Sequence, residues 1–336
     1  MNELPTQTQF WLNDLRWLLL SAPLLNPQKP SYTAVTVAFS ENECQSISHW
    51  LNEVTQSASL LEQFTQWMGS KPNRHIARLG RYAEHLLEFF LRHGPTHRLE
   101  AANLQVHAAI GGSGSKSKSK STLGEIDFLV TSQLSMRREH WELAVKFFIC
   151  PDVAPTDDPP SALRLIGPDS VDSLAAKTAK LLDRQIRQLP PAPFNAFDWL
   201  GLAFTRGWIF YRREKFMPVI DELNLHHGRG TWLEFSKLSE LECDGAPFVL
   251  LPRQRWLAPL QMQSALQEQR DVQLLNVNQL RLAISELWGG RTAGAKWPAG
   301  VLVSKMALAP ELANTINNRL IETERIMVMP DSHSCM

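Results

Sequence analysis

The chain has 336 residues, of which 44% are hydrophobic and 20% are charged, and its formal net charge is zero at pH 7. This length fits one large domain or two modest ones, and the composition is that of a folding chain rather than a disordered one. A neutral total excludes a global positive field, so any binding to nucleic acid must depend on local patches.

The sequence carries no signal for membrane insertion or for zinc binding by cysteine. The apolar run at 17–20 follows an acidic start and lacks the basic region of a signal peptide. No stretch approaches the roughly 20 apolar residues that cross a bilayer. The four cysteines are scattered without a C-x-x-C pair, so we expect reduced thiols. We therefore predict a soluble, cytoplasmic protein without a membrane partner.

Residues 1–70 are predicted to form a helical N-terminal extension. Apolar residues recur there at three- and four-residue steps, which indicates amphipathic helices. From 76 to 91 the apolar positions again trace one helical face, and the sequence His93-Gly94-Pro95 should end that helix.

Three strands are expected after this helix. The first lies around 104–108 and is followed by the Gly/Ser/Lys tract 111–121, which we expect to be a mobile loop. Residues 123–130 and 140–149 then alternate between apolar and polar positions, which is typical of half-buried strands. The segment between them, 131–139, suits a hairpin loop.

A second helix is expected to open at Gly167-Pro168-Asp169-Ser170 and to run to Gln188, and residues 208–211 are expected to form a fourth strand. The order helix, strand, strand, strand, helix, strand indicates an α/β fold over 71–215. Residues 216–336 give weaker signals and are predicted to form a C-terminal α/β region. Its expected elements are strands at 248–251, 301–305 and 325–328 and a helix at 280–288.

Two carboxylates and a lysine lie on the polar faces of the second and third strands. Asp127 belongs to the second strand, and Glu142 and Lys146 share one face of the third. If the hairpin register aligns them, the two carboxylates suit Mg²⁺, which prefers oxygen ligands and keeps several waters. The Lys146 ammonium can then position water or offset charge on a scissile phosphate. Glu84, on the preceding helix, is a candidate for a further ligand.

The segments L-G-R-Y-A-E, L-G-E-I-D-F-L and W-E-L-A-V-K-F, with the helix opened by I-G-P, resemble a bacterial family catalogued as domain of unknown function 1853. The order helix Glu, G-E-I-D and E-x-x-x-K also resembles the PD-(D/E)xK, or restriction-endonuclease-like, nuclease superfamily. The resemblance implies a restriction-endonuclease-like core, a mixed four-stranded sheet flanked by helices. It implies a nuclease that hydrolyses phosphodiester bonds of DNA or RNA with Mg²⁺ or Mn²⁺, with Asp127, Glu142 and Glu84 as metal ligands and Lys146 as a further catalytic residue.

One departure leaves an alternative open. The superfamily pattern has an acid two residues before the lysine, whereas this chain has Ala144 there and Glu142 four residues before Lys146. Because two residues along a strand span about 6.6 Å, Glu142 and Lys146 cannot both occupy the positions of the superfamily pattern without adjustment. The alternative is a catalytically inactive module with the nuclease fold that binds nucleic acid or a protein partner. Solvated cross-strand pairs on an amphipathic hairpin would explain the same charges.

Basic residues extend the hypothesis to substrate binding. Lys177, Lys180 and Arg184 recur at three- and four-residue spacing on the second helix, and Arg81 lies in a basic stretch at the first. They can follow a phosphate backbone, and a solvated helix face is the alternative. Gln185 resembles a glutamine that some superfamily members carry near the site.

Other positions carry simpler expectations. Glu88 should pair with Arg92 one helical turn later, and most of the eleven tryptophans should lie in the core. The sequence has no P-loop and no dinucleotide-binding fingerprint, which argues against nucleotide-driven chemistry. It carries no signal for an oligomeric state.

Overall fold

A computed structural model describes most of the chain. The described residues are 6–70, 78–107, 122–151, 165–169, 172–213, 215, 217–263, 272–289, 299–309 and 319–331. The chain divides into two compact units, the first comprising 1–145 and 177–206 and the second 146–176 and 207–336. The predicted division into 1–70, 71–215 and 216–336 stays a prediction.

Helices open the first unit, as the apolar periodicity predicts. They are α1 (Thr6–Leu20), α2 (Pro30–Thr33), α3 (Glu41–Gln56), α4 (Ala58–Gly69) and α6 (Leu79–His93). Helix α3 begins with a capping box, in which Ser40 and Glu43 satisfy each other's backbone N–H groups. Helix α6 ends before Gly94 as expected, and the Glu88–Arg92 pair on it is confirmed, with Arg92 Nη2 2.8 Å from Glu88 Oε1.

Four strands of the first unit follow one another in the order β1-β2-β3-β4. They are β1 (His97–His107), β2 (Thr122–Ser132), β3 (Arg138–Ile149) and β4 (Leu200–Arg212), of which β3 and β4 continue into the second unit. Strands β1 and β2 pair antiparallel, as do β2 and β3. The predicted β2–β3 hairpin is therefore confirmed, whereas the tract 111–121 lies outside the described residues.

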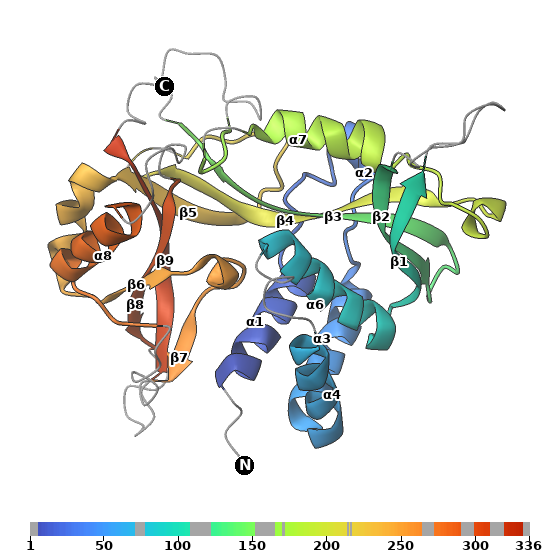
Figure 1. The fold of residues 1–336 in the computed structure, drawn as a ribbon, viewed down its shortest axis with the longest axis horizontal. Coiled ribbons are helices and arrows are strands. Elements are labelled where there is room, and N and C mark those ends of the chain that lie inside the picture. Colours follow the sequence, from blue (N-terminus) through green and yellow to red (C-terminus); the bar gives the residue numbers. More distant parts are fainter. Residues whose placement is uncertain are drawn as a thin grey trace, which may run out of the picture. The chain divides into compact units, whose positions relative to one another are not determined.

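Helices cover this part of the sheet on both faces. Helices α1, α3, α4 and α6 gather on one side of the strands, and α7 (Leu174–Lys180) lies on the other (Figure 1). Helix α7 passes into a π-helical turn, η2 (Leu181–Gln185), whose Leu181 packs with Ala144 and Ala203 of the strands. The short 3₁₀ helix η3 (Phe194–Ala196) precedes β4.

The second predicted helix is shorter than expected. It begins at Leu174 rather than near Asp169, because Ser173 Oγ accepts the Ala176 N–H at 3.2 Å and caps the first turn there. Its last turn is closed by the hydrogen bond from the Ile186 N–H to the Leu181 carbonyl, five residues back, so regular helix does not reach Gln188.

Gly201 of β4 allows a close approach that only glycine permits. A Cβ atom there would lie 1.9 Å from the carbonyl oxygen of Ile186, a backbone atom in the turn that follows η2. We expect Gly201→Ala to lower the free energy of unfolding by about 2–4 kcal/mol, because backbone must move. Gly80→Ala is the matched control, since Gly80 lies in α6 with nothing within 4 Å of the added Cβ. In urea unfolding the control should gain about 0.5–1 kcal/mol, and equal responses would contradict the prediction.

The second unit is built on strands that pair in mixed directions. They are β5 (Gly228–Glu234), β6 (Phe248–Leu251), β7 (Gln261–Gln263), β8 (Val301–Leu308) and β9 (Arg319–Met329). Strand β5 is parallel to both β4 and β9, whereas β8 is antiparallel to β9 and to β6. Helix α8 (Val277–Gly289) and the 3₁₀ helix η4 (Phe235–Asp244) pack together, and a second 3₁₀ helix, η5, spans Arg253–Arg255.

The expectation of a four-stranded sheet is wrong, although the mixed α/β class is confirmed. In the second unit β4 is followed by β5, β9, β8 and β6, with β7 paired to β9, so the mixed sheet has more strands than the resemblance implies. The strand β5 has the sequence GRGTWLE, whose two glycines gave no strand signal. None of the described helices is long and apolar enough to span a bilayer.

Candidate functional site

The β2–β3 hairpin brings Asp127 and Glu142 together. Phe128 pairs with Trp141, so Asp127 and Glu142 are the next residues on the two antiparallel strands. The backbone ladder stops at this point, and the side chains replace it. Asp127 Oδ2 accepts the Leu143 N–H at 2.9 Å, and Glu142 Oε1 accepts the Asp127 N–H at 3.3 Å. The two carboxylates thus occupy the gap between the strands, as the sequence predicts if the register aligns them.

The ladder on the other side of Asp127 is interrupted as well. On β1, Ala102 pairs with Phe128 and Leu104 with Ile126, but Asn103 between them has a φ of 54°. This left-handed backbone conformation is uncommon for a residue other than glycine and is best tolerated by asparagine and aspartate. Such strained positions cluster at functional sites. Asp127 therefore lies at an irregularity in both strand pairs.

Glu142 is fully buried, and besides the Asp127 N–H of β2 it is held by side-chain donors from two elements. His140 Nε2–H donates to Glu142 Oε1 at 2.8 Å from the same strand, and Gln185 Nε2 donates to Oε2 at 2.9 Å. Gln185 is the last residue of the π-helical turn η2, and π-helical turns are frequent at functional sites. His140 was not predicted as a site residue, although strand parity places it on the face of Glu142.

The environment of Asp127 disfavours its charged form. Burial is the largest cause that raises the pKa of this carboxyl well above its usual value, and the charges of Glu142 and Glu84 raise the pKa further. The hydrogen bond from the Leu143 N–H acts in the opposite direction. A cation bound beside Asp127 would relieve this repulsion.

Arg81 holds the outer carboxylates of the cluster. Its Nη1 donates to Glu84 Oε2 at 2.7 Å and to Asn103 Oδ1 at 3.0 Å, and its Nη2 donates to Glu125 Oε2 at 3.0 Å. The hydrogen bond from Arg81 lowers the pKa of Glu125. The predicted ligand Glu84 thus lies near Asp127 but is paired with Arg81, and the predicted phosphate contact Arg81 is engaged by carboxylates.

The structure explains why an acid is missing at position 144. Ala144 is buried in an apolar cluster with Leu181, Ile186 and Ala203, where an ionised carboxylate would be costly. Glu142, two residues earlier on the same strand, is the acid that reaches Gln185. Lys146 is half-buried on β3 and belongs to the second unit.

The predicted basic set follows α7 and η2. Lys180 and Arg184 are exposed, and Lys177 is half-buried. Arg184 lies directly before Gln185, so the set adjoins the turn that contacts Glu142. The lysines of the tract 111–121 lie outside the described residues.

The donor set suits magnesium only with help from water or substrate. Among the described residues, no group of three or more His, Cys, Asp or Glu side chains is arranged to hold a metal ion. Asp127 and Glu142 supply two carboxylates, and Mg²⁺ is commonly held by one or two carboxylates, waters and substrate phosphates. The residues present therefore fit such an ion and do not form a complete protein cage.

The fold and the site define a mixed α/β protein with a carboxylate pair, the half-buried Asp127 and the buried Glu142, between two strands of a hairpin. A family model described as Domain of unknown function (DUF1853) matches residues 13–329, and the chain belongs to this family. The searches of curated proteins and of solved structures gave no match.

Proposed function

We propose that this protein is a metal-dependent nuclease that hydrolyses phosphodiester bonds of DNA or RNA. The observation that carries the proposal is the meeting of Asp127 and Glu142 where the β2–β3 ladder opens, with the pKa of Asp127 raised by burial and by the neighbouring carboxylates. A site that disfavours its own carboxylate charge in this way is suited to a cation.

Each residue of the first unit has a separate role in the proposal. Asp127 and Glu142 would hold Mg²⁺ or Mn²⁺, which supplies Lewis-acid stabilisation of the phosphate when bound. His140 and Gln185 fix the orientation of Glu142 through its two oxygens. Arg81 neutralises Glu84 and Glu125 and so keeps the cluster from carrying four unpaired negative charges.

Two further roles come from the sequence pattern. Lys146 follows Glu142 on β3, and the resemblance to the PD-(D/E)xK superfamily assigns it the task of orienting water or offsetting charge on the phosphate. The helix–strand–strand–strand–helix–strand order of 79–212 supports a restriction-endonuclease-like core. Lys180 and Arg184 are exposed beside the site and would contact the phosphate backbone.

A second candidate is a catalytically inactive module that binds nucleic acid or a protein partner through this scaffold. The observation that favours it is the engagement of Glu142 by His140 and Gln185, with Ala144 buried at the usual position of an acid. Such a module would keep binding without cleavage.

Cleavage assays separate the two candidates. Purified protein is incubated with single- and double-stranded DNA and RNA in Mg²⁺ or Mn²⁺, beside Asp127→Ala and Lys146→Ala variants. We expect cleavage by the wild type and a loss of about 100-fold or more in either variant, the usual effect of removing a group that stabilises the transition state. Glu53→Gln is the control, because Glu53 is exposed on α3. Absence of cleavage by the wild type, with binding unchanged in both variants, supports the inactive module.

A further inference from the structure

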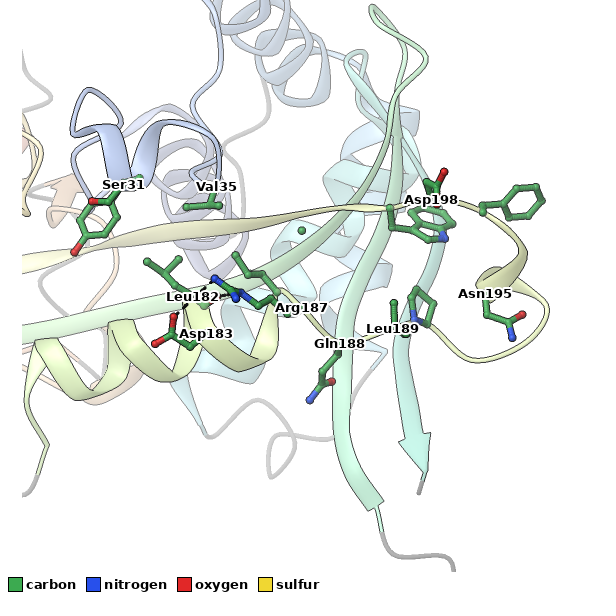
Figure 2. Close-up of a pocket in the computed structure, with 15 residues that line it drawn as sticks. Ser31, Val35, Leu182, Asp183, Arg187, Gln188, Leu189, Asn195 and Asp198 are labelled. Atoms are coloured by element: carbon green, nitrogen blue, oxygen red, sulfur yellow. Dashed lines mark hydrogen bonds and ion pairs between the residues drawn. The ribbon is translucent and has the colours of Figure 1, made fainter. Parts of the chain in front are cut away.

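A pocket of about 700 Å³ lies in the first unit, beside the turn that carries Gln185. The next three residues, Ile186, Arg187 and Gln188, line it. In Figure 2, Ser31, Val35 and Asp183 lie toward one end and Asn195 and Asp198 toward the other, with Arg187 between them. The volume falls within the range of about 300–1,000 Å³ that is typical of small-molecule sites.

Three aromatic side chains contribute flat surfaces to this pocket: Tyr32, Phe197 and Trp199. The Trp199 ring is fixed, because its Nε1 donates to the Phe194 carbonyl oxygen at 2.8 Å. Phe197 is 47% exposed, and the guanidinium of Arg138 lies 4.1 Å from the centre of its ring. Exposed or partly exposed aromatic rings held in place in this way are suited to stacking against a planar heterocycle.

The polar groups of the pocket match the edge and the phosphate of a nucleotide. Arg187 Nη2 lies 4.0 Å from Asp183 Oδ1, and both side chains are about 70% exposed, at 72% and 68%. Such a pair is weak. The Nε of Arg187 donates to the Leu182 carbonyl oxygen at 3.1 Å, so its Nη groups remain available for phosphate. Asp198, exposed and next to Trp199 in the chain, supplies a carboxylate for an amino group. The Oε1 atom of Gln188 is buried and accepts no hydrogen bond from the described residues.

The pocket is connected to the carboxylate pair by direct packing. A Cβ atom at Gly124 of β2 would lie 2.2 Å from Gln188 Nε2, so the strand that carries Asp127 lies against the wall of the pocket. On its other flank, Gln185 donates to Glu142 three residues before Gln188. The elements that line the pocket are therefore the same ones that hold the carboxylate pair.

We infer that the pocket binds an unpaired nucleobase with an exocyclic amino group, and that the protein takes single-stranded nucleic acid. The inference rests on the proposed function, which gives nucleic acid as the substrate, and it specifies single-stranded nucleic acid as the substrate class. The base stacks on Trp199, its amino group donates to the neighbouring Asp198, and Arg187 contacts an adjacent phosphate. A base inside a duplex exposes neither its face nor its full edge, so duplexes are excluded from the pocket.

Binding in EDTA tests this inference without any contribution from cleavage. Labelled 12-nucleotide single strands of adenine, cytosine or uracil, and a duplex of equal length, are titrated with wild-type protein and followed by fluorescence anisotropy. We expect adenine and cytosine strands to bind more tightly than uracil strands and the duplex. Trp199→Ala should weaken binding to the adenine strand about 10-fold, the loss expected for one stacked base.

Matched variants keep the test interpretable if Trp199→Ala folds poorly. Trp199→Phe retains a ring and should bind within about twofold of the wild type, since stacking tolerates the exchange of rings. Arg187→Gln should lower affinity and the salt dependence of binding. The control Arg253→Gln, at an exposed arginine of the second unit, should change neither the affinity nor the salt dependence of binding. Circular dichroism checks the fold of each variant.

The outcomes separate the pocket from the proposed hydrolysis. Binding that depends on Trp199 and Arg187 in a protein that cleaves nothing would support the pocket and contradict the nuclease. Equal affinity for single strands and duplexes, wild-type affinity in both Trp199→Ala and Arg187→Gln, or no binding of any nucleic acid would overturn the inference. Binding of an unstructured peptide that competes at the pocket while nucleic acid does not would overturn it as well.

Discussion

Asp127→Asn is expected to raise the Tm of the metal-free protein by a few degrees at pH 8 while abolishing magnesium-dependent cleavage. The asparagine keeps an oxygen for the Leu143 N–H that Asp127 Oδ2 accepts in the wild type. It removes a carboxyl whose pKa in the folded protein is raised, first by burial and then by the charges of Glu142 and Glu84. The Tm of the metal-free variant rises because the substitution removes the repulsion between carboxylates, which a bound cation would relieve in the wild type.

The sign of the pH dependence follows from that raised pKa. Below pH 3.8, the pKa of this carboxyl in the unfolded chain, the carboxyl is protonated in both the folded and the unfolded state. It then makes no contribution to the pH dependence of stability. As the pH rises, the unfolded state loses its proton first, so wild-type stability falls until the folded carboxyl has also ionised. The advantage of Asp127→Asn should therefore grow from pH 4 to neutral pH. Urea unfolding across this range measures it, with Glu53→Gln as the control.

Magnesium should reverse the ranking of the two proteins. A ligand that binds only the folded state at about 100 times its Kd adds about 2.7 kcal/mol to stability. Added Mg²⁺ should thus raise the Tm of the wild type and leave Asp127→Asn unchanged. If the variant is no more stable than the wild type at any pH and both ignore Mg²⁺, Asp127 belongs to a solvated pair and the carboxylate site is wrong.

Arg206→Met is expected to lower the free energy of unfolding by about 2–4 kcal/mol. The variant loses three charge-assisted hydrogen bonds of about 1.5–3 kcal/mol each. This loss exceeds the free energy gained because a charge is no longer buried. Arg206 is 1% exposed, and burial lowers the pKa of its guanidinium to about 9. Its Nε and Nη2 donate to the carbonyl oxygens of Leu18 and Leu19 at 2.8 and 3.3 Å, and its Nη1 donates to Thr205. The bonds to Leu18 and Leu19 satisfy carbonyls at the last turn of α1.

Urea unfolding with two companion variants tests this assignment. Arg206→Lys should lose at least as much stability as Arg206→Met, since it keeps the buried charge and presents fewer donors. Arg98→Met is the control, because Arg98 is an exposed arginine of β1 paired with Glu100, and it should lose less than about 1 kcal/mol. A neutral Arg206→Met would show that α1 does not need this cap.

The hairpin at the centre of the site is largely readable from the sequence. Alternation of apolar and polar residues predicts strands at 123–130 and 140–149, and the structure has them at Thr122–Ser132 and Arg138–Ile149. That parity places Asp127 and Glu142 on the polar faces. It could also have singled out His140, two residues before Glu142, because strand parity puts both on one face.

Other strands escaped prediction because their signals come from packing. Strand β5 contains Gly230, and a Cβ atom there would lie 2.6 Å from ring carbons of Phe210 and 2.7 Å from the Arg325 carbonyl oxygen. The glycine is thus explained by neighbours from β4 and β9, which no local propensity reports. The same holds for Gly201 against Ile186. Glycine has a low strand propensity, so only the folded neighbours show why these positions lie in strands.

The sequence by itself determined the mixed α/β class, the helical start, the hairpin and the residues Asp127, Glu142 and Lys146 as candidates, since period and parity are local properties. The tertiary structure decided how the acids are used. It placed Gln185 on Glu142 through a π-helical turn, paired Arg81 with Glu84, and buried Ala144 where the pattern expects an acid. These outcomes depend on contacts between segments far apart in the chain, which fix the charge and the hydrogen bonds at each carboxylate.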